Sequence, residues 1–249
     1  WQDALLATDE LAIVAGGDGS VSAVVTALDN RRVPVGILPT GSGNNIARSL
    51  GVFGPLEQVI PRLPHAGTVP LRVCRADGPW GCRTFVESVG LGVLALVAEE
   101  LQHEKLDGDE KLQRGRDSLI GPLETLDPIP VAIAVDGEPL SGDHLLVEVM
   151  NIPMIGPNLR LVPDVPSRDD LLVVAVLPAN GRRAMIDWVC GGATGPSPLR
   201  QVRGRIVTLQ GEGQALRLED KSRTWDGSRV RLSAEPDPVR ILLPGDMRR

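Results

Sequence analysis

The chain has 249 residues, which is enough for one or two domains with a sizeable core. Hydrophobic residues make up 42% and charged residues 23%, as in an ordinary globular protein, and no apolar run approaches the length of a membrane span. A formal charge of −6 and only 2% aromatic residues argue against nucleic acid as the main partner, because nucleic-acid surfaces need positive charge and stacking side chains.

The cysteines give no sign of a disulfide framework or a zinc site. Cys74, Cys82 and Cys190 are widely spaced and form no C-x-x-C pair. No signal peptide is visible in the sequence. We therefore expect a cytoplasmic protein with reduced thiols. Transient contact with a membrane surface stays open, because local patches matter more than the total charge.

Helix and strand patterns alternate over the first 50 residues. Residues 2–10 resemble the end of a helix, and the following elements are strand 11–15, helix 20–28, strand 33–38 and helix 44–50. Strands that are apolar on every side need neighbours in a parallel sheet, and two strands are too few to stand alone. We therefore expect residues 1–66 to be the remainder of an α/β domain. Either its N-terminal part is missing from this chain, which begins at Trp1, or residues 236–249 return to complete its sheet.

After residue 67 the pattern becomes mainly β, and we expect a second domain over residues 67–235. Gly, Pro, Asp and Ser punctuate short runs typical of an antiparallel sheet or sandwich. These runs are residues 69–75, 131–135, 145–150, 171–177, 202–209, 215–218, 230–232 and 239–243. One helix is predicted at 93–106, and the charged segment 106–117 is predicted to be a mobile surface connection. Asp136-Gly137 is a typical two-residue hairpin turn.

Two glycine-rich turns follow the first two apolar strands, and each one opens a helix. The first contains Gly16, Gly17, Asp18, Gly19 and Ser20, and the second contains Gly41, Ser42, Gly43 and Asn44. Glycine allows a backbone to approach a ligand closely, and helix N-termini attract anions. The pair predicts a phosphate pocket, although each turn alone is equally compatible with a tight strand-to-helix connection.

These residues resemble the signatures of the diacylglycerol kinase catalytic-domain family, especially its soluble bacterial lipid-kinase branch. The family's Gly-Gly-Asp-Gly-Thr is similar to residues 16–20, and its Pro-x-Gly-Thr-x-Asn-Asp-x-Ala-Arg-x-Leu-Gly is similar to residues 39–51. Similarity continues in the same order at 85–92, 151–164, 169–172 and 225–228. The resemblance covers nearly the whole chain, which makes it far more specific than either turn.

The resemblance implies a NAD kinase/diacylglycerol kinase-like fold, in which an α/β nucleotide-binding domain meets a mainly antiparallel β-sandwich at a cleft. The family transfers the γ-phosphoryl group of ATP, with Mg²⁺, to a lipid hydroxyl. ATP and Mg²⁺ are therefore the expected cofactors, and a diacylglycerol-like or sphingoid lipid is the expected acceptor. A homodimer stays open.

The resemblance also assigns roles to particular residues. The ATP phosphates would be held by Gly16, Gly17, Asp18, Gly19, Ser20, Gly41, Ser42, Gly43 and Asn44. Arg48 could reach a phosphate or form an ion pair. Asp226 would be the general base, and Asp18 would also serve the metal–water network. Asp169, with the backbone carbonyl of Leu171, matches a structural Mg²⁺ position of the bacterial branch, although Asp169 is equally compatible with a simple turn.

Some positions depart from the family pattern and keep two other functions open. Asn45 and Ser228 stand where the family has Asp and Glu, Ala23 stands where it usually has Glu, and an N-terminal strand with Asn-Pro-x-x-Gly is not in this sequence. The first alternative is a catalytically impaired homologue that binds nucleotide or lipid. The second is a kinase of a soluble acceptor such as NAD or a sugar phosphate.

Overall fold

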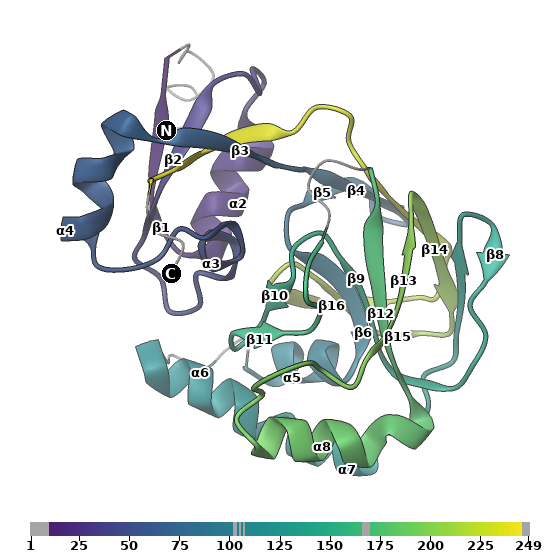
Figure 1. The fold of residues 1–249 in the computed structure, drawn as a ribbon. Coiled ribbons are helices and arrows are strands. Elements are labelled where there is room, and N and C mark those ends of the chain that lie inside the picture. The colour runs from purple at the N-terminus through teal and green to yellow at the C-terminus, as the bar shows by residue number, and fades with distance from the viewer. Residues whose placement is uncertain (1–9, 102–103, 105, 107, 166–169, 246–249) are drawn as a thin grey trace.

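The computed structural model describes residues 10–101, 104, 106, 108–165 and 170–245. Its first sheet has the strand order β1-β2-β18-β3, formed by β1 (Ala12–Gly16), β2 (Pro34–Pro39), β18 (Val239–Leu243) and β3 (Gly67–Leu71). The strand β2 pairs in parallel with both β1 and β18, and β3 pairs antiparallel with β18. The chain therefore returns to its first domain at the end, as the yellow strand in Figure 1 shows.

Short helices connect the strands of this α/β domain. They are α2 (Asp18–Ala27), α3 (Asn45–Leu50), α4 (Leu56–Val59) and the 3₁₀ helix η1 (Ile60–His65). Val21 and Val25 lie one helical turn apart on the buried face of α2, which packs against β1 and shares a buried cluster with Ala12 and Val14. The helix α3 ends at Gly51, whose φ of 83° permits the left-handed C-cap.

The boundary expected at residue 67 is wrong, because β3 belongs to the first sheet. The predicted strand 69–75 is two strands: β3 ends at Leu71, and β4 (Cys74–Gly78) pairs in the sandwich. The β-type pattern of residues 69–75 does not show that the chain changes sheet at Arg72 and Val73. The N-terminal helix expected at 2–10 lies almost wholly outside the described residues.

The second domain is an antiparallel sandwich of two sheets. One sheet has the order β13-β12-β9-β6-β15-β16, formed by Arg200–Gly204, Leu172–Pro178, His144–Met150, Ser88–Gly92, Gln214–Leu218 and Lys221–Trp225. The other has the order β5-β4-β17-β14-β7-β8, formed by Gly81–Phe85, Cys74–Gly78, Val230–Ala234, Ile206–Gly211, Val131–Val135 and Glu138–Pro139. A small ribbon pairs β10 (Met154–Ile155) with β11 (Leu159–Arg160). The predicted strand 202–209 is thus two strands, one in each sheet.

The strands β9 and β12 are buried on both faces because two different layers cover them. Val147, Val149, Val174 and Val176 face the second sheet of the sandwich. Their neighbours along each strand point the other way, toward α5 (Val93–Leu101), α7 (Ile120–Thr125) and α8 (Arg182–Cys190), which lie below the sandwich in Figure 1. This face continues into the core of the α/β domain, so that the two domains share one cluster of buried side chains.

The segment 106–117, expected to be a mobile connection, contains the helix α6 (Gly108–Asp117). Arg114 of α6 forms ion pairs with Glu100 and Glu104, and Gly115 packs against Pro157. The preceding helix ends at Leu101 rather than at 106. Among the described residues, no helix is long and apolar enough to cross a membrane.

Candidate active site

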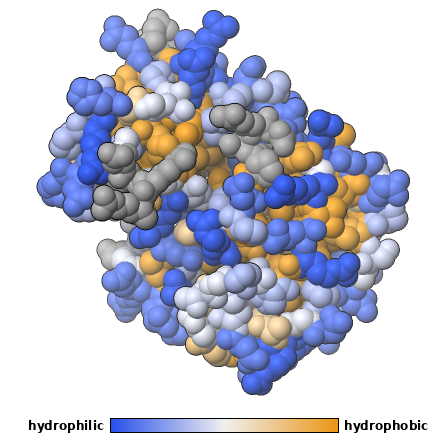
Figure 2. Space-filling model, in the orientation of Figure 1, coloured by the Kyte–Doolittle hydropathy of each residue, from blue (hydrophilic) through white to orange (hydrophobic). Residues whose placement is uncertain are grey.

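A cavity of about 650 Å³ lies between the two domains. Figure 2 shows the surface hollowed where the upper and lower lobes meet. Its upper wall consists of the two glycine turns, and its lower wall comes from α5, α6, the β10–β11 ribbon and the turn between β15 and β16. The turns and the sandwich therefore form one site from segments that are up to 200 residues apart.

The two glycine turns touch each other through their backbones. A Cβ placed on Gly41 would overlap the Cα of Gly17, and one placed on Gly17 would lie 3.1 Å from the Cα of Gly41. Side chains at these positions would push the turns apart. The glycines thus allow two strand ends to approach and leave backbone N–H groups at the cavity wall, which suits phosphate oxygens.

Asp18 connects the first turn with the second. Its Oδ1 accepts a hydrogen bond from the N–H of Ile46 at 2.8 Å, at the start of α3. Burial raises the pKa of Asp18, although hydrogen bonds from backbone N–H groups oppose this shift. The second oxygen, Oδ2, lies 3.1 Å from the position that a Cβ on Gly43 would take, and so it remains directed toward the second turn.

The polar side chains of the second turn hold the loop itself. Asn44, at a φ of 51°, accepts a hydrogen bond from Gly41 N–H at 3.0 Å and donates one to the Gly41 carbonyl at 2.6 Å. Ser42 Oγ accepts a hydrogen bond from the Gly108 N–H, which ties α6 to this turn. Arg48 donates to the Gly43 carbonyl at 3.1 Å.

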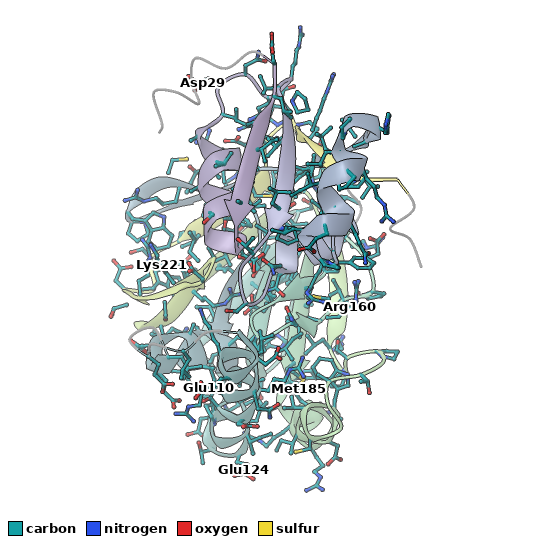
Figure 3. The ribbon with its side chains drawn as sticks, turned by 90° about the vertical axis from the view of Figure 1, so that its left-hand side faces the viewer. Asp29, Glu110, Glu124, Arg160, Met185 and Lys221 are labelled. Atoms are coloured by element: carbon teal, nitrogen blue, oxygen red, sulfur yellow. The ribbon has the colours of Figure 1, made fainter. Side chains whose placement is uncertain are left out.

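The turn between β15 and β16 brings charge to the opposite wall. Leu218 pairs with Lys221, which leaves Glu219 and Asp220 as a two-residue turn. A Cβ on Gly19 would lie 4.0 Å from Asp220 Oδ2, so this carboxylate faces the first glycine turn. Figure 3, which faces this side of the molecule, shows Lys221 beside the α/β domain, with Glu110 of α6 below it.

Glu219 points inward and joins the two domains. Its carboxylate accepts hydrogen bonds from Ser22 Oγ at 2.7 Å and from the N–H groups of Val86 and Glu87 at 2.6 and 2.8 Å. Burial raises the pKa of Glu219, and these hydrogen bonds oppose the shift. Since Ser22 lies on α2, this side chain fixes the sandwich turn against the helix that begins at the first glycine turn.

Glu87 and Arg217 form the charged floor of the cavity. Glu87 is only 4% exposed, and burial raises its pKa well above the usual range, assisted by the negative charges of Asp18 and Glu219. Arg217 is 5% exposed and donates hydrogen bonds to Ser88 Oγ at 2.5 Å and Glu148 Oε2 at 2.7 Å. The floor therefore combines a guanidinium with a carboxyl group whose neutral form is favoured by burial.

Apolar side chains line the lower part of the cavity. They come from α5, α6, the segment between these helices and β10, and they are Leu94, Val97, Ala98, Leu101, Leu106, Leu112 and Ile155. The cavity is thus divided, with backbone amides and charges at one end and aliphatic surface at the other. Such a division suits a ligand with an anionic group and a hydrocarbon portion.

Some of the predicted site residues do not line the cavity. Asp226 lies in the exposed turn after β16, where its Oδ1 accepts a hydrogen bond from the Ser228 N–H at 2.9 Å. Hydrogen bonds from Ser228 lower the pKa of Asp226. Gly16, Ser20, Asn44 and Arg48 belong to the turns and their helices but are not at the cavity wall.

The second predicted metal position is only partly described. Asp169 lies outside the described residues, and the Leu171 carbonyl accepts a hydrogen bond from the buried Arg72 at 2.8 Å. Within the described part of the chain, no three His, Cys, Asp or Glu side chains gather closely enough to hold a metal ion. A metal ion bound by the described residues would therefore need ligands other than three such side chains.

Two family models cover most of the chain. The diacylglycerol kinase catalytic domain matches residues 2–76, and the YegS C-terminal NAD kinase β-sandwich-like domain matches residues 87–242, which is more than half of the sequence. The chain belongs to the diacylglycerol kinase catalytic-domain family. The family resemblance and the fold class expected from the sequence are therefore confirmed.

Curated relatives in this diacylglycerol kinase family share about a quarter of their residues with the chain. A diacylglycerol kinase of Bacillus subtilis (strain 168) is 30% identical over 191 residues, 71% of this chain and 57% of that protein. A Shewanella frigidimarina protein named "Probable lipid kinase YegS-like" is 24% identical over 66% of this chain and 53% of its own length. The chain thus spans little more than half the length of these relatives.

One Xanthomonas oryzae relative and one solved structure align over nearly the whole chain. The relative, also named "Probable lipid kinase YegS-like", is 28% identical over 94% of this chain and 79% of its own length. The crystal structure of a diacylglycerol kinase from Bacillus anthracis str. Sterne superposes with a TM-score of 0.70 at 19% identity, covering 99% of this chain and 80% of that one. This structural likeness shows the shared fold.

The cavity also contains charged residues to which the sequence pattern gave no role. Glu87 lies inside a segment similar to the family, but nothing in the sequence marks it as a buried carboxylate. Asp220 and Lys221 come shortly after the predicted strand 215–218. Polar residues directly after a strand pattern indicate a hairpin turn, and this signal could have located them. Arg217 gives no such signal, because alternation alone predicts only which face of the strand it occupies.

Proposed function

We propose that the protein is an ATP-dependent lipid kinase that transfers the γ-phosphoryl group to the hydroxyl of a diacylglycerol-like lipid. The observation that carries this proposal is the divided cavity. The two glycine turns line one end of it, aliphatic side chains line the other, and Asp220 faces the first glycine turn. A soluble acceptor would not need the aliphatic wall. A diacylglycerol-like lipid resides in a bilayer, so the proposal includes transient contact with a membrane surface.

The glycine turns would hold the phosphates of ATP. The helix α2 begins at the first glycine turn without a side-chain cap, and its positive end, where anions are favoured, lies at the cavity wall. The second turn adds the backbone of Gly41 and Gly43. Lys221 supplies a cation at the cavity wall to neutralise charge on the transferring group. Magnesium, when bound with ATP, would neutralise further negative charge on the phosphates.

We assign the general base to Asp220 rather than Asp226. Phosphoryl transfer requires a group that orients the acceptor hydroxyl and accepts its proton. Asp220 lines the cavity and faces the first glycine turn, whereas Asp226 lies beyond the other end of β16. The hydroxyl of a lipid whose chains pack on the aliphatic wall would lie between the phosphates and Asp220.

The test is transfer of labelled phosphate from ATP, with Mg²⁺, to diacylglycerol, sphingosine, glycerol and NAD presented in mixed micelles. We expect labelled diacylglycerol, a loss of about 100-fold or more in kcat for Asp220→Asn, and a change within about twofold for Asp226→Asn, since that side chain is exposed outside the cavity. Asp226→Asn is thus the matched control for Asp220→Asn, because it makes the same chemical change outside the cavity. Loss of activity in Asp226→Asn alone would contradict the assignment of the base.

A non-catalytic nucleotide-binding protein remains the second candidate, because Asn45 is neutral where the family has a carboxylate. Ser228 no longer supports this candidate, since it lies away from the cavity. Binding of an ATP analogue without transfer to any acceptor in the panel would favour it over the kinase.

A further inference from the structure

Glu87 is a buried carboxyl group that forms no ion pair among the described residues, although the nearby guanidinium of Arg217 opposes the rise in its pKa. It is 4% exposed, lines the cavity, and accepts no side-chain hydrogen bond from the described residues. Glu219, half-buried and close to Glu87, receives three hydrogen bonds. A buried carboxylate is ordinarily paired, hydrogen-bonded or bound to a metal ion, because burying it alone is costly.

A second residue at the same cavity, Asn45, has a buried oxygen without a hydrogen-bond partner among the described residues. Asn45 is 3% exposed, and its Nδ2 donates to the Gly156 carbonyl at 2.9 Å, which fixes the orientation of the amide. Its Oδ1 is buried and accepts no hydrogen bond from the described residues. Asn45 Nδ2 and Asp18 Oδ2 lie 3.2 and 3.1 Å from the position of a Cβ on Gly43, so these two side chains flank the same turn.

We infer that Asp18, Asn45 and Glu87 provide the protein ligands for the divalent cation that accompanies ATP, with Glu87 supplying the second negative charge. Carboxylate and amide oxygens are the ligands that Mg²⁺ prefers, and one or two carboxylates with phosphates and waters complete its usual coordination. The neutral Asn45 is thus compensated by a carboxylate from the sandwich. This inference rests on the proposed function, because it assumes that the phosphates lie at the glycine turns.

The test uses Mn²⁺ as the probe and measures its binding to the nucleotide-free protein by electron paramagnetic resonance. We expect one site in the wild type, with Mg²⁺ competing for it, and a loss of affinity of about tenfold or more in Glu87→Gln, since ligand charge sets affinity. Glu104→Gln is the matched control: Glu104 lies at the same cavity but is exposed and paired with Arg114. It should change the affinity by less than about twofold.

Moving the charge provides a second test. Asn45→Asp in the Glu87→Gln background restores one carboxylate to the same group and should return Mn²⁺ affinity to within a few-fold of the wild type. Thermal unfolding separates a ligand from a structural role: Glu87→Gln should keep or raise Tm without metal and lose the rise that Mn²⁺ gives the wild type. Absence of Mn²⁺ binding in the wild type, or unchanged binding in Glu87→Gln, would overturn the inference.

The two proposals fail separately. If Mn²⁺ binding follows this pattern but no lipid is labelled, the kinase proposal fails and the cation site stands. If lipid is labelled and Glu87→Gln binds Mn²⁺ as the wild type does, the kinase proposal stands and the role of Glu87 is refuted.

Discussion

Two neighbouring glutamates show how partners decide what a buried carboxylate does. Glu219 receives hydrogen bonds from Ser22 and from two backbone N–H groups, so its charge is used to hold the two domains together. Glu87 is more deeply buried and lies close to Glu219, yet it faces the cavity. Burial raises the pKa of both side chains, but only Glu87 is free to meet a ligand.

His144 predicts a pH dependence of stability. It is 1% exposed, and burial lowers its pKa from the usual value of 6.5. The folded state therefore takes up this proton less readily than the unfolded state. The contribution of His144 is present above about pH 6.5 and is lost as pH falls below it. In urea titrations, the free energy of unfolding should fall more steeply between pH 7 and 5 in the wild type than in His144→Gln. Equal slopes would contradict this account.

Among individual residues, the sequence allowed the glycines of the candidate site to be predicted, but not the charged residues around them. Glycine has a conformational freedom that other residues lack, so Gly17, Gly19, Gly41 and Gly43 could be placed at a candidate site before the fold was known, and all four line the cavity. Glu87 and Asp220 are ordinary acidic residues in the sequence. Their importance comes from the cavity onto which the fold brings them, and no local pattern encodes that.

A buried charge network connects the strands of the sandwich sheet nearest to the site. Glu148 on β9 is fully buried and pairs with Arg217 on β15, while Ser88 on β6 accepts a hydrogen bond from the same guanidinium. Gly90 on β6 makes room for the Glu148 carboxylate, which would overlap any Cβ at that position. The network thus crosses three adjacent strands and ends at the cavity floor.

Breaking this pair should be more harmful than removing it. Arg217→Leu leaves the Glu148 charge buried without its partner, and we expect a loss of roughly 3–5 kcal/mol in the free energy of unfolding. Arg217→Leu combined with Glu148→Leu should recover most of this loss, because neither charge of the pair then remains. Urea denaturation of both single variants and the double variant measures the coupling. Additive losses in the double variant would show that the pair does not act as a unit.

Elements were predicted well where hydrophobic periodicity was strong. Strand 131–135 and strand 239–243 have the expected bounds, and 145–150 and 171–177 differ by one residue from β9 and β12. The helix α6 was missed because its stability comes from ion pairs and packing on Pro157, not from an apolar stripe. The breaks inside the predicted strands 69–75 and 202–209 were also missed, since a β-type pattern does not reveal which sheet a strand joins.

The whole molecule places the site where distant parts of the chain meet. The first sheet gains β18 only after the chain has completed the sandwich, and Glu219 then bridges to α2. Sequence motifs could identify the family, because the glycine turns are local. The cavity wall opposite the glycine turns could not be identified in this way. Its turn, Glu219-Asp220, is set by the strand pairing between Leu218 and Lys221.

Calorimetric titration with a non-hydrolysable ATP analogue most directly tests the claim that the first glycine turn holds ATP in this cavity. Gly19→Leu is the decisive variant, because Gly19 lies in α2 with ordinary φ and no atom nearer than 4.0 Å to its Cβ position. The substitution should preserve or raise helix stability, by about 1 kcal/mol, while placing a side chain where the phosphates bind. Gly121→Leu, in α7 with open space around it, is the matched control.

We predict one binding site in the wild type and in Gly121→Leu, and a loss of affinity of about tenfold or more in Gly19→Leu with Tm unchanged or higher. Wild-type affinity in Gly19→Leu would contradict the account.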